Sequence, residues 1–142
     1  MKILYRDNDK MGKGSRRERE LVNLLWESGF AVMRSPASGS GRKHPQPDVL
    51  ASNGDKEYGI ETKSSSSNAI YVKKEEVEKL GEFCDKFGCE PLIGVRFDRQ
   101  GWLFVKPDQC VETEKSLKIT KEATGIVLVK GEGFRKQKRI CG

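Results

Sequence analysis

The sequence predicts a single α/β domain in which a mixed central β-sheet of about five strands is flanked by helices. The chain has 142 residues, enough for one domain with a sizeable core. Apolar residues recur at helical spacing in residues 15–28 and 73–87. Short apolar segments bounded by turn residues, typical of strands, lie between and after these two stretches.

The first helix is predicted at residues 15–28. Ser15 and Glu18 have the spacing of a capping box, in which the serine caps the helix and the glutamate bonds back to it. Gly29 follows as the stop signal. Because Glu18 lies one turn before Leu21 on the apolar face, we expect its carboxylate to point toward the sheet.

A β-hairpin is predicted around Asn53-Gly54, a dipeptide that favours a type I′ turn because both central residues need positive φ. With the turn centred on this dipeptide, Asp48 lies opposite Gly59. Side chains alternate along a strand, so Glu61 and Lys63 share the face of Asp48. The opposite face then points into the core and carries Val49, Tyr58 and Ile60.

This arrangement suggests a metal site. We expect Gly59 to leave a gap between Asp48 and Glu61, and two carboxylates suit Mg²⁺, which takes few protein ligands and keeps waters and substrate phosphates. Glu18 would add a third carboxylate. A metal-assisted phosphodiester site follows as a hypothesis. The alternative is structural: Asp48 ends a turn, Glu61 and Lys63 form a solvated pair, and Glu18 serves only the capping box.

Other elements are predicted from local signals. Strands are expected at residues 30–34, 91–97 and 102–105. Residues 64–68 have the composition of a polar linker before the second helix, which Gly88 ends. Phe83 widens the apolar stripe of that helix, which we expect to cover the sheet and to meet a second subunit in a homodimer.

Domain boundaries follow from composition. Residues 1–11 are expected to form a leader or flexible arm, and residues 12–142 a single domain. Within it, residues 107–142 form a C-terminal extension. Two short strands are possible there, at 117–120 and 126–129, before a basic tail at 134–139.

The charge balance favours a polyanionic partner, because 27 Lys and Arg residues against 21 Asp and Glu residues give a net charge of +6. No apolar run approaches the ~20 residues needed to cross a bilayer, and no secretion signal is present, so a cytoplasmic protein is expected. The four cysteines form no Cys-x-x-Cys pair and there is one histidine, which argues against a zinc site or a disulfide framework.

Several motifs together resemble a known family. Pro47-Asp48, a spacer and Glu61-Thr62-Lys63 are similar to the hallmark of the restriction-endonuclease-like nuclease superfamily. The closer resemblance, over about residues 12 to 106, is to the archaeal Holliday junction resolvases. It rests on Lys13-Gly14-Ser15 with Glu18-Arg19, on residues 29–34 and 36–40, and on Ile70-Tyr71-Val72.

The resemblance implies a site and a substrate. Glu18, Asp48 and Glu61 would bind a divalent metal, Mg²⁺ or Mn²⁺ in its place, while Lys63 would stabilise the transition state and Ser38 would be needed for activity. A homodimer would nick two strands of a DNA four-way junction in recombination and repair. Candidates for contacts to the DNA backbone, which position DNA without reading its sequence, are Arg16, Arg17, Arg19, Arg34, Arg42 and Lys43.

Two other functions are compatible with the same residues. One is a restriction-like or repair nuclease on duplex or mismatched DNA, since the superfamily shares the metal ligands. The other is a non-catalytic nucleic-acid-binding module in which the acidic cluster is structural. Replication or repair proteins as partners are not indicated by the sequence.

Overall fold

The computed structural model describes residues 12–36 and 44–129. In chain order the elements are α2 (Gly12–Glu27), β1 (Ala31–Arg34), β2 (Val49–Ser52), β3 (Glu57–Ser65), β4 (Ala69–Lys73), α3 (Lys74–Phe87), β5 (Glu90–Phe97), β6 (Gly101–Val105), the 3₁₀ turn η2 (Pro107–Gln109), β7 (Val111–Glu112) and β8 (Ser116–Thr120). No helix among the described residues is long and apolar enough to cross a membrane.

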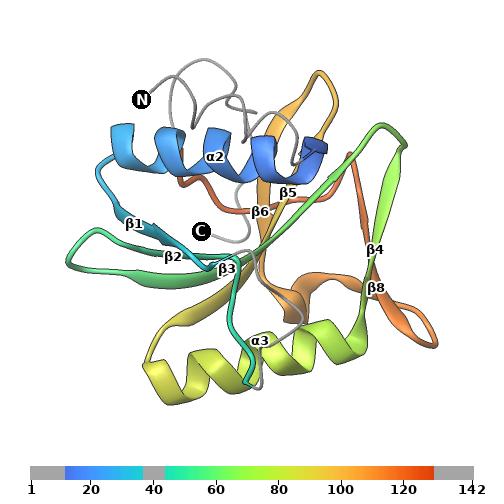
Figure 1. The fold of residues 1–142 in the computed structure, drawn as a ribbon. Coiled ribbons are helices and arrows are strands. Elements are labelled where there is room, and N and C mark those ends of the chain that lie inside the picture. The colour runs from blue at the N-terminus through green and yellow to red at the C-terminus, as the bar shows by residue number, and fades with distance from the viewer. Residues whose placement is uncertain (1–11, 37–43, 130–142) are drawn as a thin grey trace.

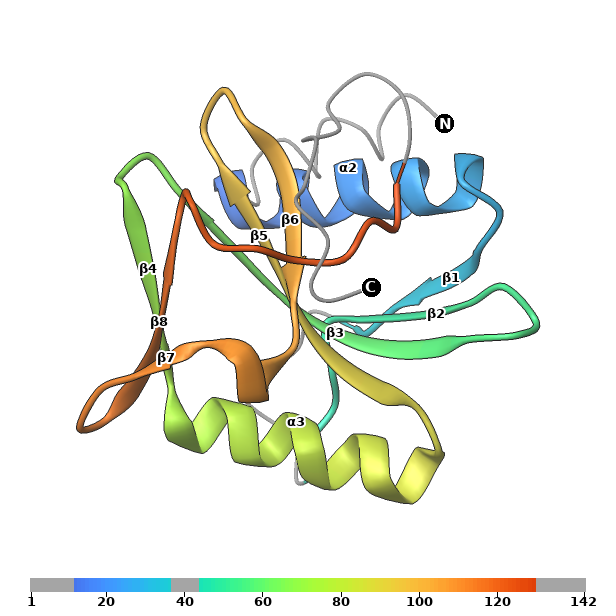
Figure 2. The same ribbon diagram turned by 180° about the vertical axis from the view of Figure 1, so that it is seen from behind.

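A mixed five-stranded sheet forms the centre of the domain, in the order β1-β2-β3-β5-β6. Only β3 and β5 pair in parallel, with α3 in the crossover between them, and the other neighbours are antiparallel. Helix α2 covers one face and α3 the other (Figure 1), and the view from behind shows the same layers (Figure 2). The predicted single α/β domain with a mixed five-stranded sheet is therefore confirmed.

The α2 face of the sheet carries one hydrophobic core. Leu21 and Leu25 are fully buried there, as the helical periodicity predicts. The inward side chains of the predicted hairpin, Val49, Tyr58 and Ile60, are buried in the same cluster. Trp102 and Phe104 complete it from β6, with their rings stacked.

The other face is covered by α3 and by a second, three-stranded sheet in the order β4-β8-β7. This second sheet was not predicted from the sequence. Because residues 64 and 65 extend β3 and β4 begins at Ala69, only residues 66–68 of the expected polar linker form a bend between strands. The predicted strand at 117–120 is confirmed within β8. At 126–129 a single bridge pairs Ile126 with Phe104 in place of a strand.

The predictions made for the ends of the helices have different outcomes. Helix α2 begins at Gly12, so Ser15 lies inside the helix and the expected capping box is wrong; its hydroxyl instead accepts hydrogen bonds from Arg19 and Arg34. Both predicted glycine stops are confirmed, since Gly29 and Gly88 have positive φ after the helix ends.

The expected arm at residues 1–11 and the tail at 134–139 lie outside the described residues.

Candidate active site

The loop of the hairpin that carries the acidic residues is longer than predicted. Leu50 pairs with Gly59, so the register is shifted by two residues from the expected one. Asn53 does not have positive φ; its side-chain oxygen accepts hydrogen bonds from the backbone N–H groups of Asp55 and Lys56, which makes a wider turn. A shift of two keeps every side chain on its predicted face, because the alternation along a strand also has a period of two.

Asp48 precedes β2, and continuing the observed register by one residue places it opposite Glu61. Its Oδ2 accepts hydrogen bonds from the backbone N–H of Thr62 at 2.8 Å and from the Thr62 hydroxyl at 3.1 Å. On the other side, the backbone N–H of Ser35 donates to the Asp48 carbonyl at 2.9 Å. Asp48 is thus fixed between β1 and β3.

Glu18 reaches the same region from α2. Its Oε1 accepts hydrogen bonds from Arg34, at 3.0 Å from Nη2 and 3.3 Å from Nε. Burial and the negative charge of Asp48 raise the pKa of Glu18, although Arg34 opposes this shift. The prediction that Glu18 points toward the sheet is therefore confirmed, with an arginine as its immediate partner.

Glu61 is the most perturbed carboxyl group of the site. Burial, and then the negative charge of Asp48, raise its pKa to about 8, and Glu76 and Glu18 act in the same direction. The positive charge of Lys63 lowers the pKa of Glu61, but it does not offset the combined effect of burial and the neighbouring carboxylates. The carboxylates therefore repel one another, which is the electrostatic condition that a bound cation relieves.

Lys63 is held by Glu76, a residue that the sequence analysis did not select. Its Nζ donates to Oε2 of Glu76 at 2.8 Å, while Oε1 of Glu76 accepts from the backbone N–H of Lys73 at 3.2 Å. Burial acts to raise the pKa of Glu76, but the hydrogen bond and charge of Lys63 outweigh it and lower that pKa. The sequence does contain a signal for Glu76: it lies three residues after Lys73, the N-cap of α3, which is the glutamate position of a capping box.

The donor set fits Mg²⁺, because Asp48, Glu61 and Glu18 offer the hard oxygen ligands that this ion prefers. In the part of the chain that the structure describes, however, no three potential ligands stand close enough to enclose an ion. Arg34 holds Glu18, and Thr62 holds Asp48. Mg²⁺ needs only one or two carboxylates when substrate phosphates supply other ligands, so Asp48 and Glu61 are the core of the candidate site.

The expected gap at Gly59 is wrong. A Cβ atom added there would lie 2.7 Å from Sγ of Cys84 and 3.3 Å from Sγ of Cys89. The space beside Gly59 is therefore filled by the C-terminal end of α3, and it cannot hold an ion between the carboxylates.

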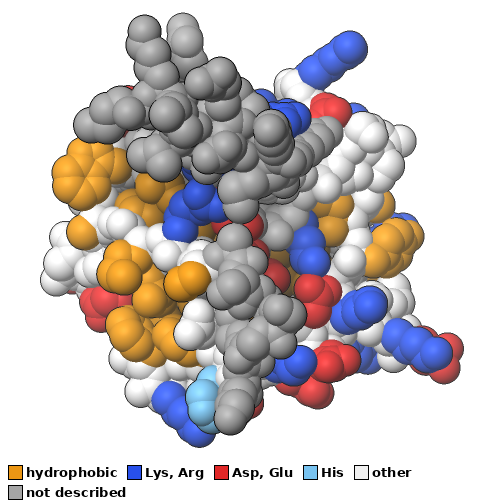
Figure 3. Space-filling model, in the orientation of Figure 1, with side chains coloured by type: hydrophobic (Ala, Val, Ile, Leu, Met, Phe, Trp, Pro, Cys, Tyr) orange, Lys and Arg blue, Asp and Glu red, His pale blue; other side chains and the backbone are white. Residues whose placement is uncertain are grey.

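The predicted phosphate-binding arginines differ in their surroundings. Arg17 is committed to ion pairs inside the domain, with Glu20 at 3.1 Å and Asp98 at 3.7 Å. Arg16 is exposed on α2. Arg19 and Arg34 both donate to the hydroxyl of Ser15 at 3.2 Å, next to the candidate site. In the orientation of Figure 1, acidic and basic side chains lie side by side at the centre of the molecular surface (Figure 3). The remaining predicted site residues lie outside the described residues: Ser38, Arg42 and Lys43.

Glu20 is a second residue that the sequence analysis missed. Its Oε1 accepts hydrogen bonds from Nε1 of the buried Trp102 at 2.9 Å and from Nε of Arg96 at 3.0 Å. One carboxylate therefore ties α2 to both β5 and β6. Since Glu18 lies two residues away, this contact sets the position from which Glu18 approaches the sheet.

The raised pKa of Glu61 predicts a pH-dependent stability of the metal-free protein. Its pKa rises from the ordinary 4.5 to about 8 on folding, so the folded state binds a proton that the unfolded chain releases. The resulting stabilisation is complete below pH 4.5 and is lost as the pH rises through about 8. Urea unfolding in EDTA should show this loss, and Glu61→Gln should flatten it. A wild-type stability that increases over this interval would contradict the assignment.

Comparisons with known proteins indicate the family of this chain. The model of a family described as archaeal Holliday junction resolvase matches residues 9–140. A crossover junction endodeoxyribonuclease of Archaeoglobus fulgidus is 37% identical over 107 residues, covering 75% of this chain and 78% of the relative. The corresponding enzyme of Sulfolobus acidocaldarius is 43% identical over 103 residues, covering 72% and 71%.

A solved structure of the Holliday junction resolvase of Archaeoglobus fulgidus superposes with a TM-score of 0.73 at 35% identity, covering 77% of this chain and 89% of that one. Its fold agrees with the layers described above, and the matched family extends past residue 107, where the motifs in the sequence ended. The chain belongs to the archaeal Holliday junction resolvase family.

Proposed function

We propose that this protein is a structure-selective DNA endonuclease that resolves four-way junctions by paired, Mg²⁺-dependent phosphodiester hydrolysis in recombination and repair. The observation that carries the proposal is the placement of Asp48 opposite Glu61 with Lys63 on the same strand, in a chain whose curated relatives are named crossover junction endodeoxyribonucleases.

The chemistry requires an attacking water, stabilisation of charge at phosphorus and protonation of the leaving oxygen. Asp48 and Glu61, with Glu18 beside them, would hold Mg²⁺, which would supply positive charge for the phosphate and a water of lowered pKa. Lys63 places an ammonium group on the same face, where it neutralises charge that develops on the phosphate oxygens. Glu76 orients that ammonium by its hydrogen bond at 2.8 Å.

A cleavage comparison tests the proposal directly. A synthetic four-way junction and its four component duplexes are incubated with the full-length protein, with Mg²⁺, with Mn²⁺ and with EDTA. We expect paired nicks near the branch point of the junction only when a divalent metal is present. Equal cleavage of the duplexes would support a restriction-like or repair nuclease, and binding without any nick would support a non-catalytic module.

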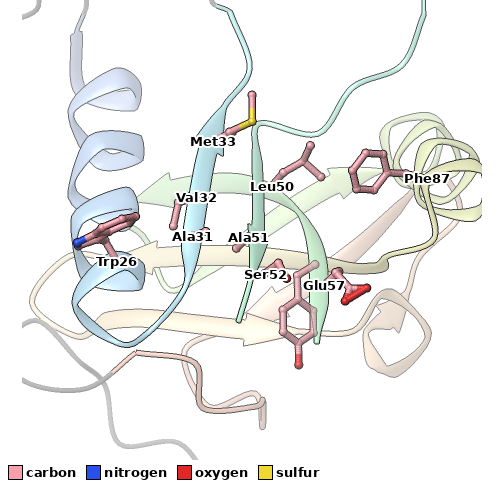
Figure 4. A pocket seen from close by; sticks show the side chains of 10 residues that line it. Trp26, Ala31, Val32, Met33, Leu50, Ala51, Ser52, Glu57 and Phe87 are labelled. Atoms are coloured by element: carbon pink, nitrogen blue, oxygen red, sulfur yellow. The ribbon is translucent and has the colours of Figure 1, made fainter. Parts of the chain in front are cut away.

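Paired incision requires two sites, and we propose that an exposed apolar surface joins two copies of the chain. Trp26, Met33 and Phe87 are 67%, 70% and 58% exposed, and all three line an open depression of about 290 Å³, which Leu50 also lines (Figure 4). The ring of Phe87 stacks on that of Phe83, with centroids 5.4 Å apart, so the residue predicted for the interface belongs to the same surface. Exposed apolar patches of this kind mark interaction sites.

Phe87→Glu should therefore convert the protein to a monomer, because it would bury a charge in the apolar contact. Sedimentation at micromolar concentration is expected to show a dimer for the wild type and a 16.0 kDa species for the variant. Lys86→Glu changes the charge of the exposed neighbouring position and should leave the dimer intact. A wild type that sediments as a monomer would contradict the proposed dimer.

A further inference from the structure

The outward face of the three-stranded sheet carries an exposed aromatic residue among lysines. Tyr71 of β4 pairs with Lys118 of β8, which pairs in turn with Val111 of β7, so the three side chains form one row. Tyr71 is 58% exposed and Val111 is 64% exposed. Their neighbours along the strands, Ile70, Val72, Leu117 and Ile119, are buried against the central sheet. The row is therefore not needed for the core, and we name Tyr71, Lys73, Lys118 and Val111 the β4–β8 surface.

The charge of the β4–β8 surface has one sign. Outward positions of the paired strands β4 and β8 alternate with the buried ones and carry no acidic residue: they are Ala69, Tyr71, Lys73, Ser116, Lys118 and Thr120. Nζ of Lys118 lies 5.9 Å from the centroid of the Tyr71 ring, near the outer limit of a cation–π contact. The ring thus keeps exposed area beside a positive charge, and this combination suits a nucleic acid strand, which offers both apolar rings and phosphates.

The β4–β8 surface is connected to the candidate active site through Glu76. That carboxylate binds both the backbone N–H of Lys73 and the ammonium of Lys63. Tyr71 lies two residues from Lys73, about 7 Å along the strand, and this is the span of about two nucleotides of a DNA strand. Figure 3 shows basic and apolar side chains over β4 and β8, on the same face as the acidic centre.

We propose that the β4–β8 surface binds the junction strand that leaves the active site, with Tyr71 packed against a sugar or base a few nucleotides from the scissile phosphate. Lys118 and Lys73 neutralise phosphates on either side of that contact. The inference rests on the proposed action on junction DNA, and it assigns to the second sheet a share of substrate binding.

The test measures affinity without cleavage. Fluorescence anisotropy with a labelled four-way junction in EDTA is recorded over a series of salt concentrations for the full-length protein. Tyr71→Ala should weaken binding about tenfold, since stacking on an aromatic side chain supplies binding that alanine cannot, while Tyr71→Phe should bind within about twofold of the wild type because the ring is retained. Lys118→Gln should lower the slope of log affinity against log salt by about one, the effect of one lost phosphate contact.

Lys79→Gln is the matched control, because it removes an exposed lysine of α3 that is not part of the β4–β8 surface, and it should leave the salt slope unchanged. Tyr71→Ala binding within twofold of the wild type, or a loss that Tyr71→Phe shares, would overturn the proposal. So would a salt slope of Lys118→Gln equal to that of the control. A wild type that binds or cuts duplexes as well as junctions would contradict the proposed function alone, since the Tyr71 comparison can be made on either DNA.

Discussion

Asp48→Asn is expected to reduce Mg²⁺-dependent cleavage of a four-way junction by at least about a hundredfold. The variant keeps the shape of the side chain, so its oxygen can still accept from Thr62, and the fold should survive. It loses the negative charge that Mg²⁺ requires opposite Glu61. Because the same charge would lie close to the DNA phosphates in the proposed complex, junction affinity in EDTA should be equal to or higher than that of the wild type.

Single-turnover cleavage with protein in excess measures the chemical step and separates it from binding. Asp55→Asn is the matched control, because it removes an exposed carboxylate from the loop of the same hairpin and should cleave normally. Near-normal cleavage by Asp48→Asn would refute the metal site and leave its carboxylate with a structural role. Raising the Mg²⁺ concentration should partly restore the cleavage rate of Asp48→Asn, because the substitution acts mainly by lowering the affinity for the metal.

Gly59→Ala is expected to lower the free energy of unfolding by roughly 1–3 kcal/mol. Gly59 faces α3, and the new methyl group would lie 2.7 Å from Sγ of Cys84, which is buried and has little room to move. Either the sulfur or the helix must shift, and close packing makes both costly. The effect should appear as a lower urea midpoint with little change in the slope of the transition.

Cys84→Ala provides the internal check, because it removes the clashing sulfur atom. The double variant should be more stable than the sum of the two single effects predicts, since the pair shares one space. Gly81→Ala is the control on the same helix: no atom lies within 4 Å of its added Cβ, so it should be neutral or stabilising. Full stability of Gly59→Ala combined with weakened Mg²⁺ binding would instead support the ion gap that the sequence suggested.

The sequence was most informative where the physical rule is local. The inward positions of α2 follow from its 3.6-residue period, and its end follows from a glycine that tolerates positive φ. The shared face of Asp48, Glu61 and Lys63 was predicted from the wrong turn and a register off by two residues. It survived because an even shift preserves the alternation of a strand.

Contacts between distant segments had no signal of this kind. Nothing in the residues around Glu18 indicates that Arg34 will hold it, and nothing around Gly59 indicates that α3 will fill the space beside it. The second sheet was missed for the same reason, since β4 and β8 are separated by 42 residues between Lys73 and Ser116 and each is too short to stand out. Strand pairing over such a separation depends on the packing of the intervening chain.

By itself, then, the sequence determined which carboxylates and which lysine share a strand face, and the family to which those motifs belong. Only the tertiary structure decided their partners: Thr62 on Asp48, Arg34 on Glu18 and Glu76 on Lys63. The physical reason is that alternation and helical period are fixed by backbone geometry within a few residues. Ion pairs and hydrogen bonds between elements depend on how the layers pack, and that packing is a property of the whole chain.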